Sequence, residues 1–195
     1  NMEKSKWSHP LKAIIIGGSA GSLEVLFQVL PLLKSTLSVP VIIVLHRRSS
    51  GRSSLHELLA YKTALPLCEV EDKEPIRPGH IYLAPANYHL LIEDVNSFSL
   101  DDSEKVHYSR PSLDVTFESA ADVYGANVVG LILSGANEDG TRGLQAIKGK
   151  GGCIAVQLPS TAKVPVMPQS ALDHVGADYV LATNEIADFI NHLGP

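Results

Sequence analysis

The chain has 195 residues, of which 45% are hydrophobic and 19% are charged, and its formal net charge at pH 7 is −5. This length and balance fit one soluble α/β domain, and the negative charge argues against bulk binding of nucleic acid. No apolar run approaches the roughly 20 residues that span a bilayer, and the polar start lacks the apolar segment of a signal peptide. Cys68 and Cys153 are far apart in sequence, so we expect buried thiols in a cytoplasmic protein.

The first third of the chain predicts two strand–helix units. An apolar run over 12–17 predicts a strand, and the helical spacing of leucine and phenylalanine that follows predicts a helix over 21–34. The segment VPVIIVL at 39–45 is apolar throughout, which is typical of a parallel strand covered on both faces. A short helix is expected over 53–62.

The middle of the chain has a different pattern. Between 64 and 102 the segments IYLAP, HLLIE and FSLD are short, β-rich and separated by proline, asparagine and glycine. This pattern predicts antiparallel hairpins that leave the parallel core.

The last part returns to alternating strands and helices. We expect a helix capped by Ser112 and ending near 124, strands over 127–134, 151–157 and 178–181, and helices over 139–149, after Pro168 and from about Asn184. Regular alternation predicts a doubly wound, mostly parallel α/β sheet with helices on both faces and an antiparallel hairpin excursion. We expect one domain over 12–195, preceded by a polar segment over 1–11 in which Asn1 is a cloning remnant.

Three predicted strands end in residues that can perform chemistry. Ser19 follows the first strand in IGGSAGS, His46 follows the second in VLHRRSS, and SGANEDG after a third carries Glu138 and Asp139. The carboxyl ends of parallel strands meet at one edge of a sheet, so these side chains can converge. A serine needs a base to take its proton, and a carboxylate can orient that base. The spacing leaves Glu138 and Asp139 as competitors, and Asp139 could instead be a helix N-cap.

The glycines around Ser19 predict a sharp turn. Gly17 and Gly21 tolerate tight backbone conformations, so Ser19 would lie exposed at a helix N-terminus. Backbone N–H groups there, that of Ala20 among them, could hold an oxyanion. The same glycines leave a dinucleotide site as an alternative, although Ser19 falls where the second glycine of that motif belongs.

Two further features concern ligands. Arg47 and Arg48, with Arg52, could grip an acidic partner or could simply be solvated. Arg47 and Arg48 also follow the second strand, where they could bind the 2′-phosphate of NADP. No pair of histidines has metal-ligand spacing beside other ligands, so we expect no metal site.

Six segments from about Lys12 to Leu193 together resemble one known family. They are IGGSAGS, VLHR, YLAPANYHLLI (82–92), RPSLDVTFESAA (110–121), LSGANEDGTRGL (133–144) and Met167-Pro168. In this order they resemble the catalytic domain of the CheB-type chemotaxis-receptor methylesterases. The resemblance implies a triad of Ser19, His46 and Asp139, which selects Asp139 over Glu138. It also implies a doubly wound, mostly parallel sheet with an antiparallel hairpin.

The resemblance implies a reaction and partners as well. The reaction is hydrolysis of glutamyl methyl esters on the cytoplasmic helices of methyl-accepting chemoreceptors, with release of methanol and with glutamine deamidation as a second activity. It needs no metal or organic cofactor. The receiver domain usual in the family is not in this chain, and a receiver or methyltransferase domain could act from a longer chain or in trans.

The chain departs from the family pattern beside the expected site. The family commonly has threonine and then two glycines after the nucleophile, whereas Ala20, Gly21 and Ser22 stand here. It commonly has methionine in the loop before the acid, where this chain has Ala136. Oxyanion or supporting roles are expected for Ala20, Gly21 and Ala136. The departures also leave open a regulatory or binding module on the same fold, beside the NADP-dependent oxidoreductase.

Overall fold

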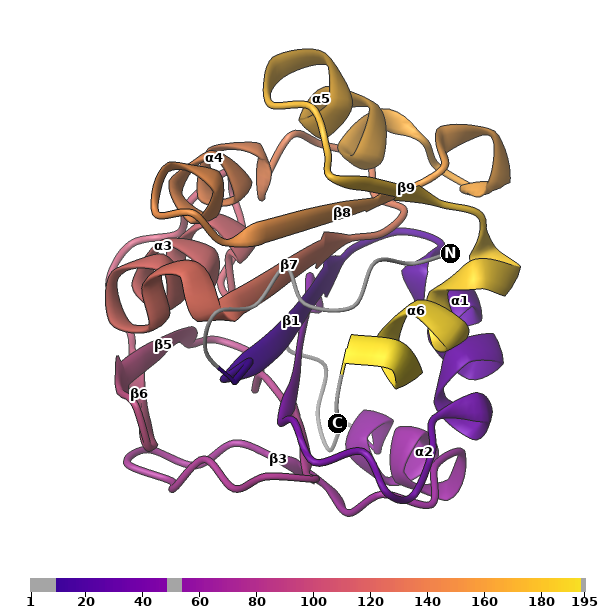
Figure 1. Ribbon diagram of the computed structural model, residues 1–195. Coiled ribbons are helices and arrows are strands. Elements are labelled where there is room, and N and C mark those ends of the chain that lie inside the picture. The colour runs from indigo at the N-terminus through magenta and orange to yellow at the C-terminus, as the bar shows by residue number, and fades with distance from the viewer. Residues whose placement is uncertain (1–9, 49–53, 194–195) are drawn as a thin grey trace.

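The computed structural model describes residues 10–48 and 54–193, and they form a parallel sheet of seven strands in the order β3-β4-β2-β1-β7-β8-β9 (Figure 1). The strands are β1 (Ala13–Gly18), β2 (Val41–Leu45), β3 (Leu67–Glu69), β4 (Ile81–Leu83), β7 (Val128–Ile132), β8 (Cys153–Gln157) and β9 (Tyr179–Leu181). Every pair of neighbours is parallel. The predicted mostly parallel α/β sheet is confirmed.

The prediction of antiparallel hairpins over 64–102 is only partly right. β5 (His89–Asp94) and β6 (Ser97–Asp101) form an antiparallel hairpin of their own. The segments 67–69 and 81–83 instead pair in parallel with each other, and 81–83 also pairs with β2. All three residues of 81–83 are buried, so this strand belongs to the covered core despite the proline and glycine around it.

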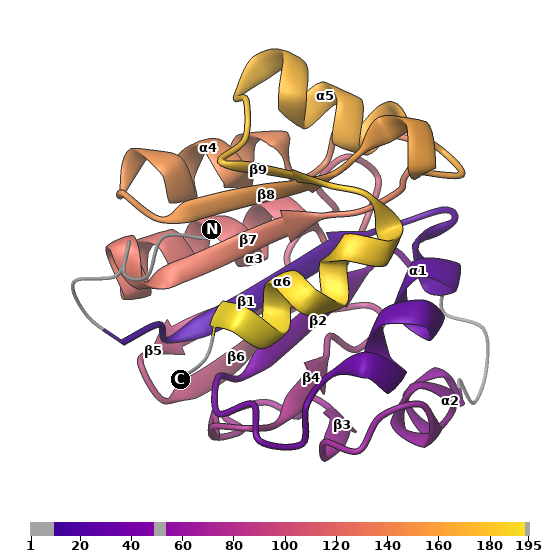
Figure 2. The ribbon, with the colours of Figure 1, turned by 45° about the vertical axis from the view of Figure 1, so that its right-hand side comes forward.

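Helices cover both faces of the sheet (Figure 2). One face packs against α1 (Ser22–Val29), α2 (Leu55–Tyr61) and α6 (Ile186–Leu193). The other packs against α3 (Leu113–Tyr124), α4 (Thr141–Gly149), α5 (Val166–His174) and the β5–β6 hairpin. The sheet is therefore the buried middle layer of three.

Two helix boundaries differ from the expected ones because of proline. The helix expected over 21–34 ends at Val29 and continues as a 3₁₀ turn over Leu30–Leu32, which contains Pro31. Helix α5 begins at Val166, so Pro168 lies inside its first turn rather than before it. A first-turn N–H has no intrahelical partner, so proline is tolerated there.

The order of the strands fixes where a site can form. From the central strand β1 the chain builds β2 and β4 on one side, and then crosses to build β7, β8 and β9 on the other. The direction of winding therefore reverses between β1 and β7, and such a reversal opens a crevice at the carboxyl ends of the strands. Among the described residues, no helix has the length and apolar character needed to cross a bilayer.

Candidate active site

Ser19 lies on a tight turn between β1 and α1. The Ser22 N–H donates to the Ser19 carbonyl at 3.0 Å, and Gly21 has φ 80° and ψ −8°, the values of the third residue of a type II turn. A side chain at Gly21 would strain this left-handed backbone. The Ser19 N–H donates to the Ser134 carbonyl at 2.9 Å, which ties the turn to the end of β7. Ser19 remains half-buried at the edge of the sheet.

Gly17 lets another helix approach this turn. A Cβ at Gly17 would lie 2.4 Å from Cδ2 of Leu113, the first residue of α3. Contacts under 3.0 Å are essentially never seen for real Cβ atoms. Glycine at the end of β1 thus admits the N-terminus of α3 to the site.

His46 and Asp139 form a buried pair at the same edge. His46 follows β2, and its N–H donates to the Gly18 carbonyl at 3.1 Å. Its Nε2 lies 2.6 Å from Asp139 Oδ2, and the exposed fractions of the two side chains are 10% and 0%. Among the described residues the Ser19 hydroxyl makes no hydrogen bond to this imidazole, and Nδ1 is the ring nitrogen left for a substrate-side proton.

Four donors hold the Asp139 carboxylate. Oδ1 accepts from Ser112 Oγ at 2.9 Å and from the Asp114 N–H at 3.0 Å, while Oδ2 accepts from the Leu113 N–H at 2.7 Å besides contacting His46. Burial alone raises the pKa of Asp139, but the hydrogen bonds from His46 and from these backbone groups outweigh it and hold the pKa below its ordinary value. Asp139 is therefore ionised, as an orienting acid must be.

Helix capping at this site differs from the prediction. Ser112 stands at the N-cap position of α3, but its hydroxyl bonds Asp139 and not its own helix. Asp139 does not cap α4 either. That helix end is capped by Asp114, whose Oδ1 accepts from the N–H groups of Gly140 at 2.9 Å and Gly143 at 2.7 Å.

Asp114 and His107 are the residues that sequence reasoning missed. His107 Nε2 lies 3.1 Å from Asp114 Oδ2, and the Asp114 side chain is fully buried. Burial and the charge of Asp139 raise the pKa of Asp114, against the hydrogen bond from Gly143. Asp114 is part of the motif RPSLD, but an acid in the first turn of a helix is common. Its position alone therefore did not indicate a role at the site.

The side chains of His107, Asp114 and Asp139 have the composition of a metal-ligand set, with ligand atoms all within 4.8 Å of one another. Each Asp139 oxygen already accepts two hydrogen bonds, as does Asp114 Oδ1. A carboxylate oxygen has two lone pairs, so these three oxygens have none left for an ion. The group is explained as a hydrogen-bonded network.

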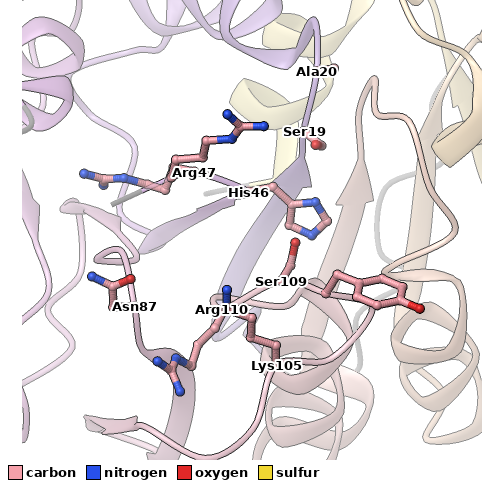
Figure 3. Close-up of a pocket in the computed structure, with 10 residues that line it drawn as sticks. Ser19, Ala20, His46, Arg47, Asn87, Lys105, Ser109 and Arg110 are labelled. Carbon is pink, nitrogen blue, oxygen red and sulfur yellow. The ribbon is translucent and has the colours of Figure 1, made fainter. Parts of the chain in front are cut away.

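A cavity of about 740 Å³ opens beside Ser19 and His46 (Figure 3). Its described lining residues are Ser19, Ala20, His46, Arg47, Arg48, Asn87, Lys105, Tyr108, Ser109 and Arg110. Four of these are cationic, and none is acidic, so the cavity favours a negatively charged molecule. In Figure 3 the Ser109 hydroxyl points toward the His46 ring.

The three arginines expected near the site have different environments. The Arg47 side chain is 9% exposed and donates to Glu69 Oε2 at 3.1 Å and to the Ala84 carbonyl at 3.3 Å, so it is anchored to β3 and to the residue after β4. Arg48 is exposed at the cavity. Arg52 lies outside the described residues.

The three residues expected to support the oxyanion or the site, Ala20, Gly21 and Ala136, lie in different environments. Ala20 is exposed and lines the cavity, and its N–H donates to no acceptor among the described residues. Gly21 faces Ser134 and Lys163 instead, and Ala136 is exposed outside the described cavity lining. Of the three, Ala20 is placed to present a backbone donor to a molecule at Ser19.

Comparison with known proteins relates most of this chain to one family. The sequence model of the CheB methylesterase family covers residues 14–190. A Leptospira interrogans relative is 42% identical over 182 residues, which cover 93% of this chain and 94% of that one. A protein-glutamate methylesterase/protein-glutamine glutaminase of Thermotoga maritima is 33% identical over 93% of this chain, which spans 54% of that protein.

A solved structure agrees in fold. The crystal structure of the Thermotoga maritima CheB methylesterase catalytic domain superposes with a TM-score of 0.89 at 32% identity, covering 95% of this chain and 100% of that one. These matches support a methylesterase and not the alternative NADP-dependent oxidoreductase. The chain belongs to the CheB methylesterase family.

Proposed function

We propose that this chain hydrolyses glutamyl methyl esters of chemoreceptors with Ser19 as nucleophile, His46 as general base and Asp139 as the orienting acid. The observation that carries the proposal is the buried contact of 2.6 Å between His46 and Asp139 at the edge of the sheet where Ser19 is presented. A carboxylate on one ring nitrogen fixes the tautomer and stabilises the imidazolium. Here that nitrogen is Nε2, so Nδ1 receives the serine proton.

The reaction then proceeds in two halves. Ser19 Oγ attacks the ester carbonyl and passes its proton to His46, which returns it to the leaving methoxide as methanol departs. A water molecule next attacks the acyl group, giving its proton to His46, and the glutamate is released as Ser19 regains a proton. The N–H of Ala20 supports the developing oxyanion. The same steps on a glutamine side chain release ammonia, the second activity named for the Thermotoga maritima relative.

The cationic cavity supports an acidic protein surface as substrate. Arg48, Lys105 and Arg110 line the cavity beside the nucleophile. Long-range attraction between opposite charges raises association rates and is screened by salt. We expect Arg48→Glu with Lys105→Glu to raise KM at low ionic strength, and this increase to shrink in high salt. A KM that is unchanged at low salt would remove these residues from substrate recognition.

The direct test is methanol release from methylated chemoreceptor membranes by the wild type and by Ser19→Ala. The matched control is Ser160→Ala, an exposed serine on the 3₁₀ turn Pro159–Thr161. We expect Ser19→Ala to abolish release and the control to keep it. Release that survives in folded Ser19→Ala would refute the serine mechanism. Absence of release from the folded wild type would favour the regulatory or binding module.

A further inference from the structure

Two buried carboxylates at the site each cap the other's helix. Asp139 precedes α4 but accepts from the first N–H groups of α3, while Asp114 belongs to α3 but accepts from the N–H groups of Gly140 and Gly143 at the start of α4. Both side chains are fully buried. Their carboxylates approach within 4.8 Å. The position of the acid that contacts His46 therefore depends on a second acid, which is not among the described lining residues of the cavity at Ser19.

A second histidine completes this arrangement. His107 contacts Asp114 Oδ2 as His46 contacts Asp139 Oδ2. It lies in the turn Val106–Ser109, where His107 and Tyr108 have φ of 48° and 61°. Such left-handed conformations are uncommon for residues other than glycine, asparagine and aspartate, and they persist where the surroundings require them. The strained turn holds His107 against Asp114.

We propose that Asp114 is a positioning residue of the triad, which fixes Asp139 through the start of α4 and, in its ionised form, adds a negative charge that stabilises protonated His46. The inference rests on the proposed serine mechanism. It assigns to Asp114 more than a structural cap. A neutral side chain of the same shape could accept from Gly140 and Gly143, but it would not support a cation at His46.

The charged groups around Asp114 come from four elements. Asp139 faces it from the loop before α4, and His107 from its turn. The positive charge of Arg142 on α4 lowers the pKa of Asp114, against the burial that raises it. Arg142 is itself paired with Glu118 at 2.6 Å. Glu138 and His174 line a second cavity together with Asp114, and Ser19 is not among its described lining residues. Of these groups, His107 has a side chain that is 31% exposed. A substitution at His107 can therefore change the charge beside Asp114 while the buried acid itself is kept.

The test compares Asp114→Asn with Asp122→Asn, the same substitution at an exposed position of α3. In Asp114→Asn the amide oxygen can keep the two N–H groups of α4 and the amide nitrogen can donate to His107, so the fold is retained. We expect kcat to fall about three- to tenfold with KM unchanged, and the titration of His46, followed by NMR, to move down by about 0.5–1 pH unit. Asp122→Asn should change neither quantity.

A second variant changes the net charge around Asp114 without replacing Asp114 itself. His107→Lys places a fixed positive charge beside Asp114 and should move the His46 titration in the same direction. If Asp114→Asn and His107→Lys both leave kcat and the titration at their wild-type values, Asp114 is only a helix cap and the inference is refuted. Failure of the serine mechanism would give a different result. Turnover by the wild type would then not depend on Ser19, while the titration of His46 would still respond to the charge of Asp114.

Discussion

Replacing Asp139 by asparagine tests the candidate site most directly, because the proposed mechanism gives this buried side chain a role in both stability and chemistry. The carboxylate receives four donors, two at each oxygen. An amide keeps one oxygen and turns an NH₂ group toward the other pair of donors. In either orientation one backbone N–H of α3, that of Leu113 or that of Asp114, meets the NH₂ group and loses its acceptor.

The expected cost follows from these contacts. A buried N–H without an acceptor costs about 1–3 kcal/mol, and loss of the negative charge at the start of α3 adds about 1 kcal/mol. We therefore expect Asp139→Asn to lower the free energy of unfolding by about 2–4 kcal/mol. When the NH₂ group faces His46, Nε2 must accept and Nδ1 carries the hydrogen, so His46 cannot take the serine proton. Loss of about 10⁴-fold in kcat is then expected.

The assays are urea unfolding and methanol release, each with Glu138→Gln as the matched control. Glu138 is the neighbouring acid, and its side chain is 71% exposed, so its substitution should change unfolding by less than about 0.5 kcal/mol. An Asp139→Asn protein with activity within tenfold of the wild type, or one as stable as Glu138→Gln, would refute the assignment of Asp139 as the buried orienting acid.

Three further predictions concern packing and pH. Gly17→Ala should cost about 1–3 kcal/mol of unfolding free energy by thermal or urea denaturation, because its Cβ would lie 2.4 Å from Leu113; Gly149→Ala, with no atom within 4 Å, is the control and should not destabilise. Tyr124→Phe should leave the unfolding free energy unchanged or raise it by up to about 1 kcal/mol in the same assay, since the buried Tyr124 hydroxyl has no partner among the described residues. A fall of more than about 1 kcal/mol would instead show that this hydroxyl makes a hydrogen bond. The pKa of Asp139 is lower in the folded protein than its unfolded value of about 3.9, so ionised Asp139 stabilises the fold above that pH. This stability is lost as the pH falls through the folded pKa, and the destabilisation by Asp139→Asn, measured by urea unfolding, should therefore shrink toward acid pH. A destabilisation independent of pH would contradict that shift.

The convergence of the candidate site residues could be predicted because they follow strands. Ser19, His46 and Asp139 each come after an apolar run, and parallel strands bring such ends to one edge. The choice of Asp139 over Glu138 needed family resemblance, because adjacent residues differ only in where the turn points them. The structure separates them by burial: Asp139 is fully buried and Glu138 is exposed.

The parts that sequence reasoning missed depend on contacts between distant segments. Ser112 has the sequence context of an N-cap, yet its hydroxyl bonds a residue 27 positions away. The sequence left Arg47 as either a solvated or a substrate-binding charge, but Glu69 on the edge strand β3 accepts a hydrogen bond from it. No local pattern carries either pairing, and the same holds for β3 and β4, which were expected in hairpins.

The exchange of caps between α3 and α4 also bears on how the protein opens. The first N–H groups of each helix find their acceptor only when the other helix is docked. Local fraying of either helix therefore releases both, so the two should behave as a single cooperative unit in hydrogen exchange. The amides of Leu113 and Gly143, although 30 positions apart in the chain, should then exchange with the same opening free energy. A partly opened molecule would have no half-assembled triad, because the event that frees α4 also removes the acid from His46.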